Sequence, residues 1–258
     1  MIDLHSHILP GLDDGARTPE DSLAMARVAA AGGIRTIAGT PHIRDDHSFP
    51  LPQILEALQA ARDAIDAAGV PMEVVAAGEI SVSKLADLRD EDLSALALGD
   101  GPVLLVESPY TRAAIDMDTA VSDLRVRGFT TLLAHPERSP MFQADPKLLA
   151  RLVARGAMCS VTSASMAGRF GRTAQDFTAR LFAEGLVHDV ASDAHDAEGR
   201  PPLLLDGFAA LDERMRGLLA QARWFTAEAP AAILAGEASL SPPRPPDGGG
   251  RRGRFRRR

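Results

Sequence analysis

Cysteine is nearly absent from this chain of 258 residues, which holds only Cys159. A single cysteine cannot form a disulfide within the chain, so a disulfide scaffold is excluded and a reducing compartment is the natural setting. The chain also lacks an apolar run of about 20 residues, the length that spans a bilayer. Its N-terminus lacks the basic and apolar regions of a signal peptide. We therefore expect a cytoplasmic protein with no transmembrane segment.

Aromatic residues are scarce as well, at 4% of the chain, although 45% of the residues are apolar. A core of mostly Ala, Leu and Val is typical of helices packed on a parallel sheet.

The charge is distributed unevenly, with a net positive charge at the C-terminal end. Residues 241–258 hold seven arginines and one aspartate, a charge of +6, whereas residues 1–240 carry −13. Such an acidic body argues against nucleic acid as a partner.

Two common catalytic motifs are missing. The sequence contains neither a G-x-x-x-x-G-K-[ST] phosphate loop nor a convincing G-x-S-x-G nucleophile elbow, which disfavours nucleotide hydrolysis and serine esterase chemistry. A cysteine-type phosphatase loop is excluded too, because Ser165 stands where it needs an arginine, six residues after Cys159. Cys159 is instead expected in the core, within a strand.

Seven short apolar runs alternate with segments of helical periodicity, which predicts parallel strands joined by right-handed crossovers. The predicted strands cover residues 1–4, 34–38, 72–77, 102–106, 129–134, 157–162 and 187–191. The first helix has clear boundaries, because Thr18 can cap it and Pro19 suits its first position. Asp21 can return a hydrogen bond to the cap, and Gly32 with Gly33 ends the helix.

Potential metal ligands follow six of these seven strands. They are His5 and His7 after the first strand, His42 after the second, Glu79 after the third, Glu107 after the fourth, His135 after the fifth, and Asp193 and His195 after the seventh. In a closed barrel the carboxyl ends of all strands meet at one site, whereas in an open doubly wound sheet they spread along a line. We therefore predict an α/β fold in the form of a seven-stranded (β/α) barrel, with a metal site at the C-terminal face of the strands.

The types of these side chains indicate which ions they suit. His5 and His7 lie on one side of an extended segment, so both imidazoles can bind one ion. Mixed imidazole and carboxylate ligands suit Mn, Fe or Zn better than Ca or Mg. The potential ligands exceed what one ion can bind and carboxylates can bridge, so we expect two or three divalent ions. Asp3 is expected to support a ligand, and His47 and His188 fit no ligand position.

Two arginines lie close to the potential ligands in the sequence. Arg138 comes three residues after His135, and Arg200 comes five residues after His195. The guanidinium fork matches phosphate oxygens. Together, two arginines beside a metal cluster indicate a phosphorylated substrate.

Several motifs occur together and in one order over roughly residues 1–235. They are MIDLHSHILPGLDDGA, GTPH, GEI, LLVESP, LLAHPER, SASMAGRFG and GLVHDVASDAH. In these motifs the chain resembles the polymerase-and-histidinol-phosphatase (PHP) superfamily. Within it, the chain resembles the bacterial manganese-dependent protein-tyrosine phosphatases of capsule and exopolysaccharide operons.

The resemblance implies a distorted seven-stranded (β/α) barrel of the PHP type with three metal ions, with manganese expected and iron or zinc as alternatives. It implies that His5, His7 and Asp193 hold the first ion, that Glu79 bridges to a second ion held with Glu107 and His135, and that Asp14, His42 and His195 hold the third. Arg138 and Arg200 match the family's phosphate-binding arginines. Residues 1–240 are then the phosphatase domain, and the composition of residues 241–258 predicts a disordered Pro-, Gly- and Arg-rich tail.

The reaction that the resemblance implies is removal of phosphate from protein phosphotyrosine, on a bacterial tyrosine autokinase of polysaccharide export. A small-molecule phosphatase, such as a histidinol-phosphate phosphatase, is one alternative. A non-catalytic metal-binding regulator is another. Two departures from the family pattern concern the substrate: Ser160 stands where many members have glutamine, and the segment IRDDHSFP after GTPH is short.

Overall fold

The computed structural model describes residues 1–47, 49–110 and 116–245, and the strands of this part form two parallel sheets. The three-stranded sheet has the order β1 (Ile2–Ser6), β2 (Thr36–Gly39), β4 (Glu73–Ala76). The six-stranded sheet has the order β3 (His42–Ile43), β5 (Glu79–Ser81), β6 (Val103–Glu107), β7 (Thr130–Ala134), β8 (Met158–Thr162), β9 (Asp189–Ala191). The predicted α/β fold with parallel strands is confirmed.

All seven predicted strands occur, with boundaries that differ by no more than two residues. The sequence does not predict β3 and β5, which continue the paths of β2 and β4 after short interruptions. Pro41 lies in the first interruption and has no N–H to donate, but its carbonyl accepts from Glu79 N (3.0 Å). A single seven-stranded barrel is not confirmed, because the pairing of the described residues gives nine strands in two sheets.

The first and last strands bring their carboxyl ends together. Ser6 and Ala194 form an isolated parallel bridge, and His7 N donates to Ala194 O (2.8 Å). Asp193 N donates to His5 O (2.9 Å). Residues at opposite ends of the chain therefore meet where the sequence places potential ligands.

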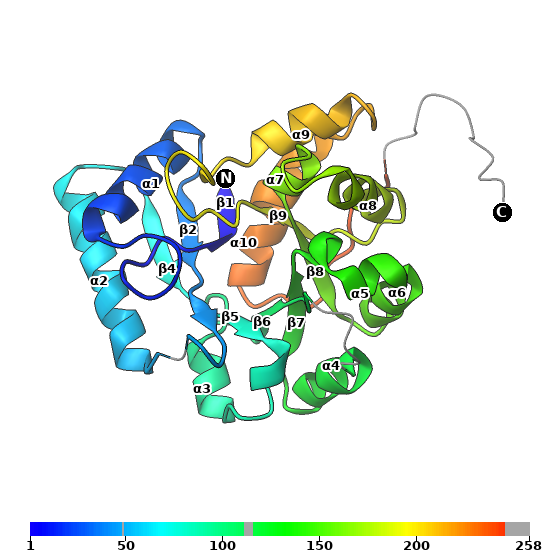
Figure 1. Cartoon of the computed structure of the whole chain (residues 1–258), viewed down its shortest axis with the longest axis horizontal. Coiled ribbons are helices and arrows are strands. Elements are labelled where there is room, and N and C mark those ends of the chain that lie inside the picture. Colours follow the sequence, from blue (N-terminus) through cyan, green and yellow to red (C-terminus); the bar gives the residue numbers. More distant parts are fainter. Residues whose placement is uncertain (48, 111–115, 246–258) are drawn as a thin grey trace.

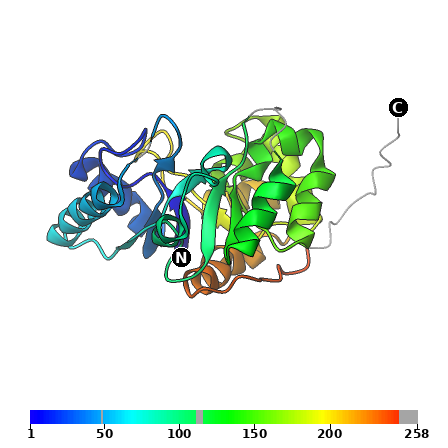
Figure 2. The ribbon, with the colours of Figure 1, turned by 90° about the horizontal axis from the view of Figure 1, so that it is seen from below.

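The helices lie around the outside of the strands, with α1 and α2 on one side and α4 to α6 on the other (Figures 1 and 2). The α-helices of the described residues are α1 (Pro19–Ala31), α2 (Leu51–Ala67), α3 (Asp90–Ala95), α4 (Met117–Val126), α5 (Pro140–Ala144), α6 (Pro146–Ala154), α7 (Ser163–Met166), α8 (Arg172–Ala183), α9 (Leu205–Asp212) and α10 (Ala229–Leu234). The helical turns of other types are η1 (Val82–Lys84), η2 (Pro136–Arg138) and η3 (Leu219–Gln221), of 3-10 type, and η4 (Trp224–Glu228), of π type. Within the described residues, no helix has the length and hydropathy needed to cross a membrane.

The start of α1 follows the predicted signals. Thr18 Oγ1 accepts from Asp21 N (3.3 Å), and Asp21 Oδ2 accepts from Thr18 N (3.2 Å). Pro19 opens the helix, and Gly33 follows its end with φ of +89°. These local hydrogen bonds satisfy amides that the first turn of a helix leaves without intrahelical partners.

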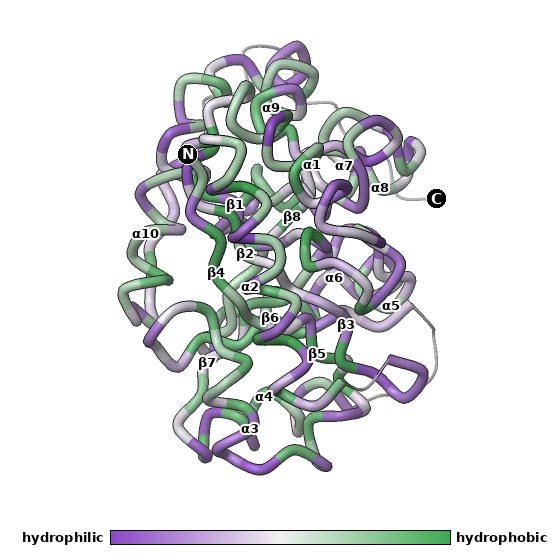
Figure 3. Tube along the Cα trace, turned by 90° about the vertical axis from the view of Figure 1, so that its left-hand side faces the viewer, coloured by the Kyte–Doolittle hydropathy of each residue, from purple (hydrophilic) through white to green (hydrophobic). Residues whose placement is uncertain are grey.

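Alternate residues of the strands face two different apolar cores. Leu104 and Leu133 belong to the larger core beneath the helices, whereas their neighbours Leu105 and Leu132 belong to a smaller core on the other face of the strands. Ile233 of α10 also belongs to the smaller core. Figure 3 shows the hydrophobic segments concentrated along the strands. Both faces of the parallel strands are covered, which leaves their carboxyl ends as the polar region of the fold.

The last described residues lie against the folded body. Pro242, Pro243 and Pro245 line a narrow space together with Phe182 and Phe225. Of the predicted tail, residues 246–258 lie outside the described residues. The expected domain boundary at residue 240 stays a prediction.

Deletion of residues 246–258 is expected to leave the midpoint of thermal unfolding within about 2 °C of the full chain, because this composition cannot add to a core. Deletion from residue 241 is the matched comparison, since it also removes the three prolines that lie beside Phe182 and Phe225. Calorimetry of the full chain and of the two shortened chains measures the change in the unfolding midpoint that each deletion causes. A fall of more than about 5 °C on the shorter deletion would place part of the folded domain inside the tail.

Candidate metal and phosphate site

The nine residues predicted as metal ligands gather at the carboxyl ends of the strands. Eight of them are buried, with at most 8% of the residue exposed: His5, His7, His42, Glu79, Glu107, His135, Asp193 and His195. Asp14 is the exposed member, and its side chain is 57% accessible. It lies in the loop between β1 and α1, which folds back over the strand ends.

Four overlapping groups of these side chains place their ligand atoms within 4.8 Å of one another. The groups are His5, His7 and Asp193; His5, Glu79 and His135; His42, Glu79 and Glu107; and His7, Asp14, His42 and His195. Each predicted ligand is thus in at least one group. Shared members, such as Glu79, link the groups into one cluster.

Several buried atoms of the cluster point toward a common space rather than at hydrogen-bond partners. Glu79 Oε2 lies 3.4 Å from His5 Nε2, 3.6 Å from His7 Nε2 and 2.8 Å from His42 Nδ1. None of these four atoms makes a hydrogen bond to another described residue. A buried polar atom left unpaired costs about 1–3 kcal/mol. Four such atoms around one space, from three imidazoles and a carboxylate, fit divalent cations.

Asp13 supports the cluster from the first loop. Its Oδ2 lies 2.7 Å from His7 Nδ1 and accepts from His42 N (3.0 Å), and its Oδ1 accepts from Gly15 N (3.1 Å). Burial raises the pKa of Asp13, but the contact with His7 outweighs it and holds that pKa well below its usual range. A carboxylate on Nδ1 orients the ring so that Nε2 faces a metal. The resemblance seen in the sequence implies Asp14 as a ligand, and it gives no role to Asp13.

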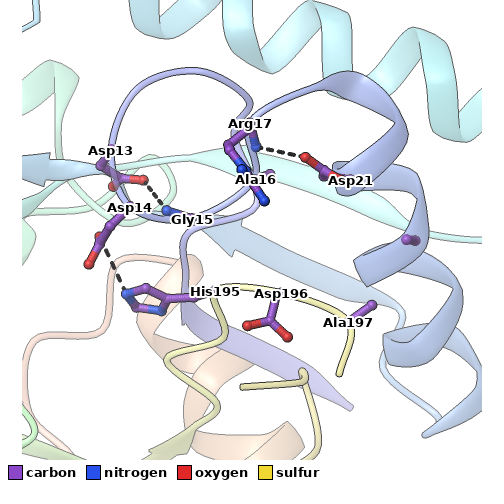
Figure 4. A pocket seen from close by; sticks show the side chains of 10 residues that line it. Asp13, Asp14, Gly15, Ala16, Arg17, Asp21, His195, Asp196 and Ala197 are labelled. Atoms are coloured by element: carbon purple, nitrogen blue, oxygen red, sulfur yellow. Dashed lines mark hydrogen bonds and ion pairs between the residues drawn. The ribbon is translucent and has the colours of Figure 1, made fainter. Parts of the chain in front are cut away.

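Gly15 explains why this loop can fold so close to β1. A Cβ atom on Gly15 would lie 2.1 Å from His7 O, so another residue would force the loop away from the strand. Figure 4 shows Gly15 beside Asp13, and it shows Asp14 directed at His195. Asp14 Oδ1 is 3.4 Å from His195 Nε2. The glycine thus brings both aspartates to the cluster.

Two ligand residues have an unusual backbone. His135 (φ +35°) and Asp193 (φ +52°) lie in the left-handed region, which residues other than glycine rarely adopt. Both follow the end of a strand. Strained backbone of this kind persists where the surrounding structure fixes it and is common at functional sites.

Burial sets the protonation of two imidazoles. Burial and the nearby Arg138 lower the pKa of His135 to about 4, and burial with the nearby His7 lowers the pKa of His195 to about 4. Both rings are therefore neutral at pH 7, the form that binds metal. Burial, together with the Glu79 charge, raises the pKa of Glu107 to about 7. A cation beside Glu107 would favour its ionised form.

Arg138 and Arg200 meet at the same carboxylate. Nη2 of Arg138 donates to Asp193 Oδ2 (2.5 Å), and Nη2 of Arg200 donates to the same oxygen (2.7 Å). Both arginines line a cavity of about 150 Å³, together with Arg44, Tyr110 and the ligands Asp14, His42, Glu107, His135, Asp193 and His195. The cavity therefore combines potential cation ligands with donors suited to an anion. Arg44 and Tyr110 follow no motif that would identify them from the sequence.

The remaining histidines and Cys159 lie outside the four groups. His47 is in the turn after β3, and its Nδ1 contacts Asp46 (3.2 Å). His188 is buried just before β9, where its Nδ1 accepts from Cys159 N (3.2 Å). Cys159 is fully buried, as expected for a core residue. Asp3 lies behind His5, and it accepts from Ser192 N (3.0 Å) and from His5 N (3.3 Å).

Asp189 is a buried carboxyl in β9 that the sequence does not single out. Ser160 Oγ donates to its Oδ2 (2.5 Å), while its Oδ1 has no hydrogen-bond partner in the described part of the chain. Burial raises the pKa of Asp189 to about 7, because ionisation costs more free energy away from water.

Asp189→Asn is expected to stabilise the chelator-treated protein at pH 8 but not at pH 4. The unfolded chain releases the Asp189 proton near pH 4 and the folded chain near pH 7, so stability falls as the pH rises through this window. Asparagine does not ionise and avoids that loss, which is of the order of 1–4 kcal/mol. Urea unfolding at both pH values measures it, with the exposed Asp66→Asn as control. Equal effects of Asp189→Asn at pH 4 and pH 8 would contradict the prediction.

The fold and the cluster define a class: an α/β protein that gathers imidazoles, carboxylates and arginines at the carboxyl ends of parallel strands. The chain belongs to the CpsB/CapC family of capsular polysaccharide synthesis, whose family model matches residues 1–234. It is 36% identical to tyrosine-protein phosphatase YwqE of Bacillus subtilis, over 78% of this chain and 79% of that protein. It is 29% identical to tyrosine-protein phosphatase CpsB of Streptococcus pneumoniae, over 81% of this chain and 88% of that protein.

A solved structure agrees with these similarities. It comes from a description of the crystal structures of YwqE from Bacillus subtilis and CpsB from Streptococcus pneumoniae, which are called unique metal-dependent tyrosine phosphatases. It superposes with a TM-score of 0.80 at 31% identity, covering 97% of this chain and all of the other. The family resemblance seen in the sequence motifs is thereby confirmed.

Proposed function

We propose that this chain is a metal-dependent phosphatase that removes phosphate from protein phosphotyrosine in capsular or exopolysaccharide synthesis. The observation that carries the proposal is the cluster of nine metal-ligand side chains beside Arg138 and Arg200 in one cavity. Similarity to proteins named tyrosine-protein phosphatase, over about four fifths of the chain, supports the same reaction.

Three divalent ions, with manganese expected and iron or zinc as alternatives, would occupy the cluster. His5, His7 and Asp193 would hold the first; Glu79, Glu107 and His135 the second; and Asp14, His42 and His195 the third. The ligand groups support the first and third ions directly. For the second ion, Glu79 is grouped with His135 in one set and with Glu107 in another, and its unpaired Oε2 faces the same space. The ions, when bound, would supply Lewis-acid stabilisation of the phosphoryl oxygens and a nucleophile near neutral pH.

The two arginines would receive the phosphate. The chain around the site is acidic, with −13 over residues 1–240, so positive charge for a dianion has to come from within the cavity. Arg138 is largely buried, with a side chain 9% accessible, and Arg200 is at 35%. Asp193 holds both guanidinium groups. They would stabilise the negative charge on the equatorial phosphoryl oxygens in the transition state.

The two sheets would act together as a distorted seven-unit barrel of the PHP type. The contact between β1 and the residues after β9 supports this, as do the continuations of β2 into β3 and β4 into β5. The substrate would be a bacterial tyrosine autokinase of polysaccharide export. A phosphotyrosine in a flexible segment could reach the cavity, and its phenolate is a better leaving group than the alkoxide of phosphoserine.

Phosphate release from three substrates in the presence of manganese tests the proposal. A phosphotyrosine peptide should be hydrolysed, a matched phosphoserine peptide only slowly. If histidinol phosphate is turned over better by orders of magnitude, the chain is a small-molecule phosphatase. Metal binding with no hydrolysis of any substrate would point to a regulator and would also overturn the proposal.

A further inference from the structure

The two arginines of the cavity share an aromatic ring as well as a carboxylate oxygen. The guanidinium carbon of Arg138 lies 4.5 Å from the centroid of the Phe170 ring, and that of Arg200 lies 5.7 Å from the same centroid. Both forks also donate to Asp193 Oδ2. Two like charges are therefore held close together by one carboxylate and one ring.

Arg138 contacts a second ring as well. Its guanidinium carbon lies 5.9 Å from the centroid of Tyr110, and Tyr110 Oη is 3.4 Å from His135 Nδ1. Aromatic rings attract cations through the negative charge of their faces. Phe170 is the ring that reaches both arginines.

Phe170 is 39% exposed and lies in a turn closed by the hydrogen bond from Gly171 N to Gly168 O (3.0 Å). It lies in the connection between α7 and α8, where Gly168 (φ +78°) and Gly171 (φ +87°) take left-handed conformations. Gln175 Nε2 donates to Met166 O (2.9 Å) and ties the start of α8 to the end of α7. Helix α8 also packs against η2, which carries Arg138. The turn that carries Phe170 is thus linked through α8 to η2, the element that carries Arg138.

We propose that Phe170 is a positioning residue that holds Arg138 and Arg200 as a single phosphate-binding pair. This inference rests on the proposed function, because it assigns the pair to phosphate. The ring offsets the repulsion between the guanidinium groups and limits their rotamers, so both forks face the cavity before substrate arrives. A leucine of similar bulk would fill the space but would lack the charged face.

Calorimetric titration of inorganic phosphate into the manganese-loaded protein tests this role. Phe170→Leu should weaken phosphate binding about tenfold, whereas Phe170→Tyr, which keeps a ring, should stay within about twofold of the original. Bound manganese should be unchanged in both. Leu219→Ala removes an exposed apolar side chain from η3 and is the control. If Phe170→Leu does not fold, Phe170→Met, which is close in volume to phenylalanine, gives the same comparison.

A double-mutant cycle distinguishes an effect of Phe170 on the position of the arginines from a general loss of structure. If Phe170 acts through the arginines, Phe170→Leu should cost no more than about threefold in an Arg138→Ala background. Unchanged phosphate binding in Phe170→Leu would overturn the inference. An equal loss of binding with and without Arg138→Ala would overturn it too, and so would weak phosphate binding by Phe170→Tyr. Turnover of phosphotyrosine peptide by the unaltered chain tests the proposed function separately, because the titrations require no turnover.

Discussion

Glu79→Gln is expected to abolish activity, by about 10³-fold or more, and to remove at least part of the bound metal. Glu79 belongs to two of the four ligand groups, and its Oε2 lies within 3.6 Å of three imidazoles. Glutamine has nearly the same shape but supplies no negative charge and only one oxygen. The substitution therefore tests ligation with little change in packing.

The same change should alter how stability depends on metal. An ion that binds only the folded chain stabilises it by about 2.7 kcal/mol at 100 times its dissociation constant. In a chain of this size that corresponds to a shift of roughly 5–10 °C in the thermal midpoint. We expect a chelator to lower the midpoint of the original protein by about this amount and that of Glu79→Gln by much less.

Elemental analysis, thermal unfolding with and without chelator, and turnover of an aryl phosphate make up the measurement. Glu56→Gln, at an exposed position of α2, is the matched control and should behave as the original. Full activity in excess chelator would refute the metal site, and an unaltered metal content in Glu79→Gln would refute the role of Glu79 as a ligand.

The sequence could predict most strands and most of the site because both depend on local signals. Each predicted strand is a short apolar run between polar segments, and every predicted ligand except Asp14 comes shortly after such a run. The cap of α1 is local too, since Thr18 and Asp21 contact each other over three residues. Such patterns act through contacts between residues that are close in the sequence, and these contacts are retained in the folded chain.

Other features depend on contacts between distant segments. Strands β3 and β5 have two and three residues, too few to show a period, and they exist because neighbouring backbone pairs with them. The contact of Asp13 with His7 depends on how Gly15 packs on His7, which no sequence pattern reveals. The left-handed backbone of His135 likewise depends on its surroundings.

The aromatic contacts of the arginines are the clearest case. Phe170 is 32 residues from Arg138 in the sequence and 30 from Arg200. Its place beside both arises because α8 packs against η2 and because Asp193 holds the two guanidinium groups together. A sequence motif can identify the arginines, but only the packing identifies what orients them.

Arg138→Ala and Arg200→Ala are each expected to keep the bound metal and to lose activity by about 10²-fold or more, the usual cost of removing one preorganised donor to a transition state. The loss should be larger for Arg138, whose side chain is 9% accessible against 35% for Arg200, because water screens a buried charge less. Asp193 keeps one arginine in either variant, so its place beside His5 and His7 should be preserved.

Steady-state kinetics on a phosphotyrosine peptide, with metal content checked in each sample, measure these effects. Lysine at either position should restore activity only in part, since an ammonium group cannot bind two oxygens as a planar fork does. Arg172→Ala, at an exposed position of α8, is the control and should turn over normally. Normal turnover by both site variants would mean that the arginines do not contact the phosphate. Loss of metal along with activity would mean that they act on Asp193, as supports of the ligand cluster, instead of on the substrate.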